Sequence, residues 1–141
     1  MKTKEHISLI GAGLSGPVMA SYLSSIGFST DVYESRSDMR TNSTSAGRSI
    51  NLALSARGIK ALKDIGVYEK IRSTLIPMSG RMIHDENGNV QFQPYGQKKN
   101  EVIYSVSRSN LNKTLMDYAE STYRVKTVSY THLTLPTIYS V

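Results

Sequence analysis

A short apolar run that leads into three closely spaced glycines constrains this chain most. Residues 6–10 (HISLI) have the composition of a buried strand, and residues 11–16 (GAGLSG) follow at once. Apolar residues then recur at helical spacing over 18–26, on what we expect to be the packed face of a helix that ends near Gly27. Residues 30–34 (TDVYE) indicate a second strand. This order predicts one β-α-β unit with parallel strands and a right-handed crossover.

The glycines of this turn suit a pyrophosphate. Gly11 permits the tight turn, the missing side chain of Gly13 lets backbone approach a ligand, and Gly16 allows the helix to pack closely on the strand. The helix N-terminus offers unpaired N–H groups and about half a positive charge. Such a turn alone is weak evidence, but with a strand before it and a helix after it the pattern favours a bound dinucleotide. The alternative is a glycine turn in an ordinary α/β domain.

Glu34 closes the second strand and narrows the choice of dinucleotide. Its carboxylate can accept hydrogen bonds from an adenosine ribose and would repel a ribose 2′-phosphate. We therefore expect FAD or NAD in this site rather than NADP.

Beyond this β-α-β unit, the sequence predicts short helices and strands. After a polar loop at 35–47, Ser55 can cap a helix that carries Leu62, and Asn87-Gly88 predicts the turn of a β-hairpin over 81–92. A strand at 102–106 precedes a final helix, for which Ser109 is the expected cap. Residues 123–126 are expected to begin a further strand.

The last residues have the features of a segment added to the native chain. Residues 127–137 (TVSYTHLTLPT) back-translate codon by codon into a transposase-type sequencing adapter read in frame. We therefore expect 127–141 to be a non-native, disordered tail and the native sequence to stop mid-domain near Lys126. A genuine strand followed by a proline turn is the alternative. Residues 1–126 would then be the N-terminal part of one domain, with a β-rich segment at 77–106.

Composition argues against several other classes of protein. The chain has 17 Lys and Arg against 11 Asp and Glu, but the basic residues are scattered, so we expect no nucleic-acid binding. There is no cysteine, and no grouping of His, Asp or Glu has metal-ligand spacing, so we expect no metal. His84 stands alone and is expected to be structural or solvated. We expect no transmembrane span and no cleaved leader, because no apolar run is long enough.

Further sequence segments indicate which of the two dinucleotides, FAD or NAD, the chain is expected to bind. Glu34-Ser35-Arg36 resembles the Glu-x-Arg ending common in flavoprotein hydroxylases. Similarity to the kynurenine 3-monooxygenase family, which consists of FAD-dependent aromatic hydroxylases, extends in order and spacing over blocks at 47–55 (GRSINLALS), 76–78, 81–84, 94–96 and 105–113 (SVSRSNLNK). The resemblance covers nearly all of residues 6–120. It implies an α/β, Rossmann-like FAD-binding domain, here truncated, with a β-hairpin segment that contributes to a substrate site.

The resemblance also implies roles for single residues. Together with the glycine turn, it predicts FAD contacts at Gly11, Gly13, Ser15, Gly16, Tyr33, Glu34, Ser35, Arg36, Ala53 and Arg108. Residues matching Arg81 and Tyr95 bind the amino-acid part of kynurenine in the family. This is chemically reasonable, because a guanidinium takes a carboxylate with two parallel hydrogen bonds and a phenol can add another. No catalytic acid or base is expected.

The implied parent protein holds FAD, uses NADPH and O2 as co-substrates, and converts L-kynurenine to 3-hydroxykynurenine. The present chain alone is expected to be inactive, and no partner protein is evident. The family resemblance implies a cytoplasmic location in bacteria and the cytosolic side of the mitochondrial outer membrane in eukaryotes. Two other classes stay open: another FAD-dependent hydroxylase or reductase of this fold, or a non-catalytic dinucleotide-binding module. The block at 47–55 argues against the second.

Overall fold

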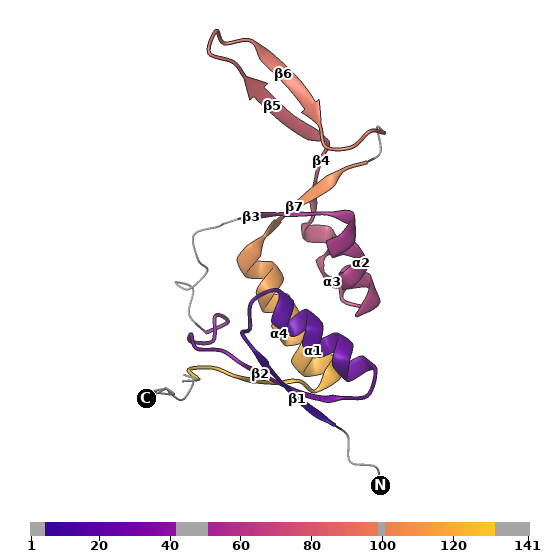
Figure 1. The fold of residues 1–141 in the computed structure, drawn as a ribbon, viewed down its shortest axis with the longest axis vertical. Helices are drawn as coiled ribbons and strands as arrows, with labels where there is room; N and C mark the ends of the chain where they lie inside the picture. Colours follow the sequence, from indigo (N-terminus) through magenta and orange to yellow (C-terminus); the bar gives the residue numbers. More distant parts are fainter. Residues whose placement is uncertain (1–4, 42–50, 99–100, 132–141) are drawn as a thin grey trace, which may run out of the picture. The chain divides into compact units, whose positions relative to one another are not determined.

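The computed structural model describes residues 5–41, 51–98 and 101–131 of the chain. It divides into two compact units, which are coloured along the sequence in Figure 1. Unit 1 is formed by residues 1–45 and 115–141, and unit 2 by residues 46–114. None of the helices among the described residues has the length and apolar character needed to cross a membrane.

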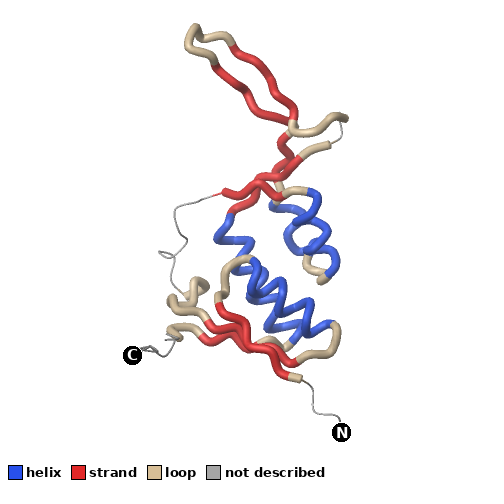
Figure 2. Tube along the Cα trace, in the orientation of Figure 1, coloured by secondary structure: helices blue, strands red, loops and turns tan. Residues whose placement is uncertain are grey.

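Unit 1 contains a parallel three-stranded sheet with the strand order β1-β2-β8. The predicted β-α-β unit is confirmed: it comprises β1 (His6–Ile10), α1 (Ser15–Ser25) and β2 (Ser29–Tyr33). The third strand, β8 (Lys126–Val128), pairs in parallel with the other edge of β2. Helix α1 and the C-terminal half of α4 (Arg108–Tyr123) lie on the same face of this sheet (Figure 2).

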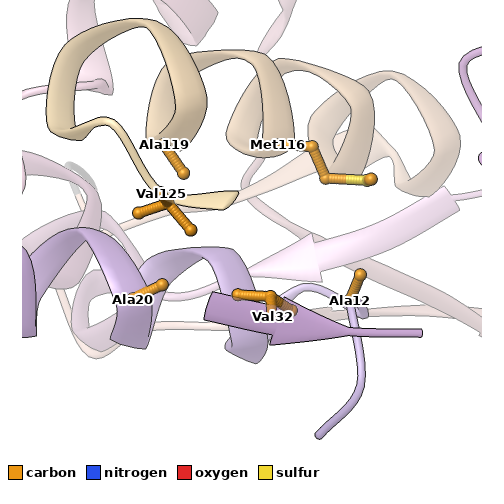
Figure 3. Close-up of a cluster of buried hydrophobic side chains, with 6 residues drawn as sticks. All are labelled: Ala12, Ala20, Val32, Met116, Ala119 and Val125. Atoms are coloured by element: carbon orange, nitrogen blue, oxygen red, sulfur yellow. The ribbon is translucent and has the colours of Figure 1, made fainter. Parts of the chain in front are cut away.

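A small apolar core joins α1, α4 and the sheet. Figure 3 shows its buried members, which are Ala12, Ala20, Val32, Met116, Ala119 and Val125. The expected packed face of α1 is partly wrong, because Met19, Tyr22 and Ile26 are about half exposed while Pro17, Ala20 and Ser21 are buried. Small residues face the sheet because the helix lies close to it, and the Ser21 hydroxyl donates to the Pro17 carbonyl, so its polar group is satisfied.

Gly16 allows this close approach. A Cβ atom at Gly16 would collide with the backbone carbonyl oxygen of Gly11 and would reach 3.7 Å from Cγ1 of Val32. Gly11 itself has a φ of 102°, a conformation that side chains disfavour. Both geometric roles inferred for these two glycines are therefore confirmed.

Unit 2 is built on an antiparallel sheet with the order β3-β7-β4. Its strands are β3 (Asn51–Leu54), β7 (Ile103–Ser107) and β4 (Ile76–Met78). Between β3 and β4 the chain forms α2 (Ala56–Asp64), α3 (Tyr68–Ile71) and the 3-10 turn η2 (Arg72–Thr74). The buried apolar side chains of this segment are Leu62, Ile65, Val67 and Ile71.

The predicted hairpin is a separate two-stranded sheet in unit 2. It pairs β5 (Gly80–His84) with β6 (Val90–Pro94). At its turn, Gly88 has a φ of 82°, and a carboxylate oxygen of Asp85 accepts the N–H groups of Asn87 and Asn89.

The two expected helix caps differ from the structure. Ser55 stands at the N-cap of α2 but its side chain makes no capping hydrogen bond. Helix α4 already begins at Arg108, so Ser109 lies inside it, and the Ser107 hydroxyl accepts the N–H of Asn110 at 3.4 Å. The helix starts earlier because β7 runs into it without an intervening loop.

The expected disorder of 127–141 is wrong for its first residues. Thr127 and Val128 pair with Val32 and Tyr33 in β8, and the Thr131 N–H donates to the Glu34 carbonyl at 2.8 Å. An open strand edge presents unpaired backbone N–H and C=O groups. A segment with β-branched residues can pair with them whether or not it belongs to the native chain. Residues 132–141 lie outside the described residues. The adapter origin of the segment stays a prediction.

Gly16→Ala should destabilise this chain by about 1–3 kcal/mol, since the added methyl group would overlap a backbone carbonyl that cannot rotate away. Gly13→Ala is the matched control: no described atom lies within 4 Å of its would-be Cβ, so we expect a change within about 0.5 kcal/mol. Urea unfolding of both variants measures the difference. Equal losses of stability would contradict the packing role of Gly16.

Candidate functional site

The glycine turn lies at the carboxyl ends of β1 and β2. The Gly11 N–H donates to the Tyr33 carbonyl at 2.7 Å, which ties the start of the turn to the end of β2. Helix α1 begins at Ser15, and its first turn contains no acidic residue. The partial positive charge of the helix N-terminus is therefore not neutralised by the helix itself, as an anion site requires.

The Glu34 carboxylate connects the glycine turn to the loop after β2. One carboxylate oxygen accepts the Ala12 N–H at 2.9 Å. Arg36 donates to the other oxygen from its backbone N–H at 3.0 Å, and its guanidinium reaches both oxygens at 2.9 and 3.0 Å. Glu34 is buried although it carries a charge, and these contacts compensate for its lost hydration.

This arrangement fixes the charge of Glu34. The side-chain hydrogen bonds from Arg36 lower the pKa of Glu34 to about 2, and the N–H groups of Arg36 and Ala12 add to the effect while burial opposes it. The carboxylate is therefore ionised at neutral pH. It would accept hydrogen bonds from hydroxyl groups and repel a phosphate placed beside it.

Two pockets flank this carboxylate within unit 1. The first contains four of the predicted cofactor residues, and its lining is Ile10, Gly11, Tyr33, Glu34, Ser35 and Thr131. The second includes Arg36, and its lining is Ala12, Glu34, Arg36, Ser37, Asp38, Met39, Met116 and Ser129. The structure thus brings most of the predicted unit 1 residues together around Glu34.

Sequence reasoning missed Arg40, which attaches this loop to α4. Its guanidinium binds Asp38 at 2.7 Å, Glu120 at 2.6 Å and Asp117 at 3.1 Å. Asp38 and then Glu120 raise the pKa of Arg40, and Arg40 lowers the pKa of Asp38. The available signal was the repeated spacing of Glu34-x-Arg36 and Asp38-x-Arg40, but the partners on α4 are far away in the sequence.

The remaining predicted residues lie in unit 2. Ala53 is an exposed residue of β3 opposite Ser105, and Arg108 is the exposed first residue of α4. The predicted substrate residues Arg81 and Tyr95 lie on the hairpin.

Arg81 and Tyr95 share one face of the hairpin. Arg81 is paired with Gln93, and the Tyr95 N–H continues the ladder by donating to the Ser79 carbonyl at 3.0 Å. Since side chains alternate between the faces of a strand, Tyr95 lies on the same face as Gln93 and therefore as Arg81. The opposite face carries the facing pair Met82 and Phe92 and, nearer the turn, His84 opposite Val90.

His84 is an exposed residue of β5. No group of three or more His, Cys, Asp or Glu among the described residues is arranged to hold a metal ion.

Comparison with known proteins agrees with this geometry. The family model described as an NAD(P)-binding Rossmann-like domain matches residues 9–75. Kynurenine 3-monooxygenase of Legionella pneumophila (strain Corby) is 44% identical over 86% of this chain. Kynurenine 3-monooxygenase of Sus scrofa is 49% identical over 83% of this chain. Over most of its length, the chain is similar in sequence to these kynurenine 3-monooxygenases.

The chain spans only about a quarter of the length of these curated relatives, 27% of the bacterial and 25% of the porcine protein. A solved structure, the tetrameric form of 2-methyl-3-hydroxypyridine-5-carboxylic acid oxygenase, has the same fold with a TM-score of 0.75 and 18% identity. That likeness covers 92% of this chain and 32% of the oxygenase. The Rossmann-like fold expected from the glycine turn is thereby confirmed.

The depressed pKa of Glu34 predicts that stability depends on acidity. The ionised Glu34 carboxylate contributes to the free energy of unfolding. This contribution is fully present above the ordinary pKa of 4.5 and is lost as the pH falls through about 2. We expect a loss on the order of 1–2 kcal/mol, since solvent screens the exposed guanidinium of Arg36. Urea unfolding between pH 6 and pH 2 measures it, with Glu34→Gln as the control that should show a shallower dependence. Identical slopes for both proteins would refute the assignment.

Proposed function

We propose that this chain is the N-terminal portion of an FAD-dependent monooxygenase that hydroxylates L-kynurenine to 3-hydroxykynurenine with NADPH and O2. The observation that carries the proposal is the ionised, buried Glu34 beside the glycine turn, in a chain related over most of its length to kynurenine 3-monooxygenases. This combination favours an adenosine-containing cofactor without a 2′-phosphate.

The residues of unit 1 fit FAD. The N-terminus of α1 would face the pyrophosphate, where Gly13 leaves room for close approach of a ligand. Glu34 would accept hydrogen bonds from the ribose hydroxyls. The proposed contacts with FAD further include Ser15, Tyr33, Ser35, Arg36, Ala53 and Arg108. When bound, FAD supplies the redox and oxygen chemistry, while the protein binds, orients and excludes water.

The hairpin fits a zwitterionic amino-acid substrate. Arg81 carries a guanidinium on the same face as Tyr95, and no carboxylate among the described residues lies within ion-pair distance of it. A substrate carboxylate would supply the missing negative charge, and the phenol could donate one further hydrogen bond. In this proposal the two side chains hold the amino-acid part of kynurenine.

The proposed domain organisation keeps residues 1–126 as native and 127–141 as derived from a sequencing adapter. The match of residues 127–137, when back-translated, to such an adapter supports this division. The β-rich segment at 77–106 would lie near the substrate. The chain by itself would be inactive, since it spans about a quarter of its relatives' length. We propose a cytoplasmic parent in a bacterium, or one on the cytosolic side of the mitochondrial outer membrane in a eukaryote.

Glu34→Ala in a full-length protein with this N-terminal sequence should weaken FAD binding by about ten- to a hundredfold, the effect of losing hydrogen bonds to a charged group. The flavin retained per protein chain after gel filtration measures it, and circular dichroism reports whether the variant folds. Glu69→Ala is the control, because this exposed acid lies on α3. A folded Glu34→Ala protein with full flavin occupancy would contradict the cofactor assignment.

Arg81→Ala in the same protein should raise the KM for kynurenine about ten- to a hundredfold, because one charge-assisted contact with the carboxylate is lost. Steady-state NADPH oxidation at varied kynurenine concentration measures KM. Arg72→Ala, which removes an exposed arginine of η2, should leave KM unchanged. If KM also stays at its original value in Arg81→Ala, another residue binds the carboxylate.

A further inference from the structure

We infer that Gln93 is a positioning residue for substrate recognition, which acts by holding the guanidinium of Arg81 in one orientation. The inference rests on the proposed function, in which Arg81 binds the substrate carboxylate. Arg81 on β5 and Gln93 on β6 are directly paired across the hairpin. The Nε–H of Arg81 donates to the Oε1 atom of Gln93 at 2.7 Å.

The atom that Gln93 engages decides how Arg81 can bind an anion. A guanidinium can bind a carboxylate side-on, through Nε and one terminal nitrogen, or end-on, through both terminal nitrogens. Because the Nε–H is already donated to Gln93, the side-on mode is blocked. The two terminal nitrogens stay available, so the carboxylate would be bound end-on.

The hydrogen bond also lowers the cost of ordering Arg81. Arg81 is exposed on a two-stranded hairpin, and an arginine side chain loses rotamer entropy when it is fixed. Gln93 restricts the side chain before the substrate arrives, so less freedom remains to be lost on binding. The expected consequence is tighter binding of carboxylate-bearing substrates, with little effect on the steps that follow.

The hairpin provides a matched control for this role. Gln91 is the same residue type on the same strand, and by alternation it lies on the same face as Gln93. Its cross-strand partner is Ile83, and Arg81 donates to Gln93 instead. A general effect of removing a glutamine from this exposed face would therefore appear in Gln91→Ala as well.

The test uses the full-length flavin-loaded protein. Gln93→Ala should raise the KM for kynurenine about three- to tenfold, as expected for one hydrogen bond, with kcat within about twofold. Gln91→Ala should change neither parameter. Gln93→Glu should raise KM further than Gln93→Ala, because a carboxylate at position 93 would compete with the substrate for Arg81.

Repeating the Gln93→Ala change in the Arg81→Ala protein distinguishes a positioning role of Gln93 from structural damage to the hairpin. If Gln93 acts through Arg81, the loss of kcat/KM from Gln93→Ala should disappear when Arg81 is already alanine, whereas structural damage would persist. An unchanged KM in Gln93→Ala, or an equal loss in both backgrounds, would overturn the inference while leaving the proposed function intact. A flavin-loaded wild-type protein that does not hydroxylate kynurenine would overturn the proposed function and this inference with it.

Discussion

The buried carboxylate of Glu34 is the group on which the proposed dinucleotide site depends. Its two oxygens join the glycine turn, through Ala12, to the loop after β2, through Arg36. A buried charge is tolerated only when it is compensated, and here the compensating donors are the same groups that shape the site. The charge of Glu34, the position of the loop after β2 and the geometry of the glycine turn are therefore linked. A substitution of Glu34 is expected to alter all three together.

Around this carboxylate, unit 1 combines close packing with a second electrostatic contact. The Gly16 position brings α1 against the glycine turn, and the core side chains that meet α1 are small. Arg40 then attaches the loop after β2 to Asp117 and Glu120 on α4. Because Arg40 follows Arg36 closely in the chain, this contact limits how far the loop carrying Arg36 can move. The site is thus supported from both the turn and the loop.

Sequence reasoning succeeded where the signal was local. Gly11, Gly16 and the Asn87-Gly88 turn specify backbone geometry within a few residues, and the structure agrees. It failed where partners are distant in the chain, as for Arg40 and α4, or where burial depends on tertiary packing, as for the exposed face of α1. A strand near Lys126 was expected, but its pairing through Val128 was not, since pairing with an open edge follows from the neighbouring strand. The cross-strand pairing of Arg81 with Gln93 likewise requires the hairpin register.

We propose that the pocket beside Glu34 in unit 1 holds an adenosine-containing cofactor, and that Arg81 and Tyr95 on the hairpin of unit 2 bind an acidic group. In this proposal, both groups of residues serve the oxygenation of kynurenine. The most direct test supplies the full-length protein with kynurenine, NADPH and isotopically labelled O2 and examines the product by mass spectrometry. We expect 3-hydroxykynurenine that carries one labelled oxygen atom and forms only when NADPH is present. NADPH oxidation that leaves kynurenine unmodified, in a protein with full flavin occupancy, would contradict it.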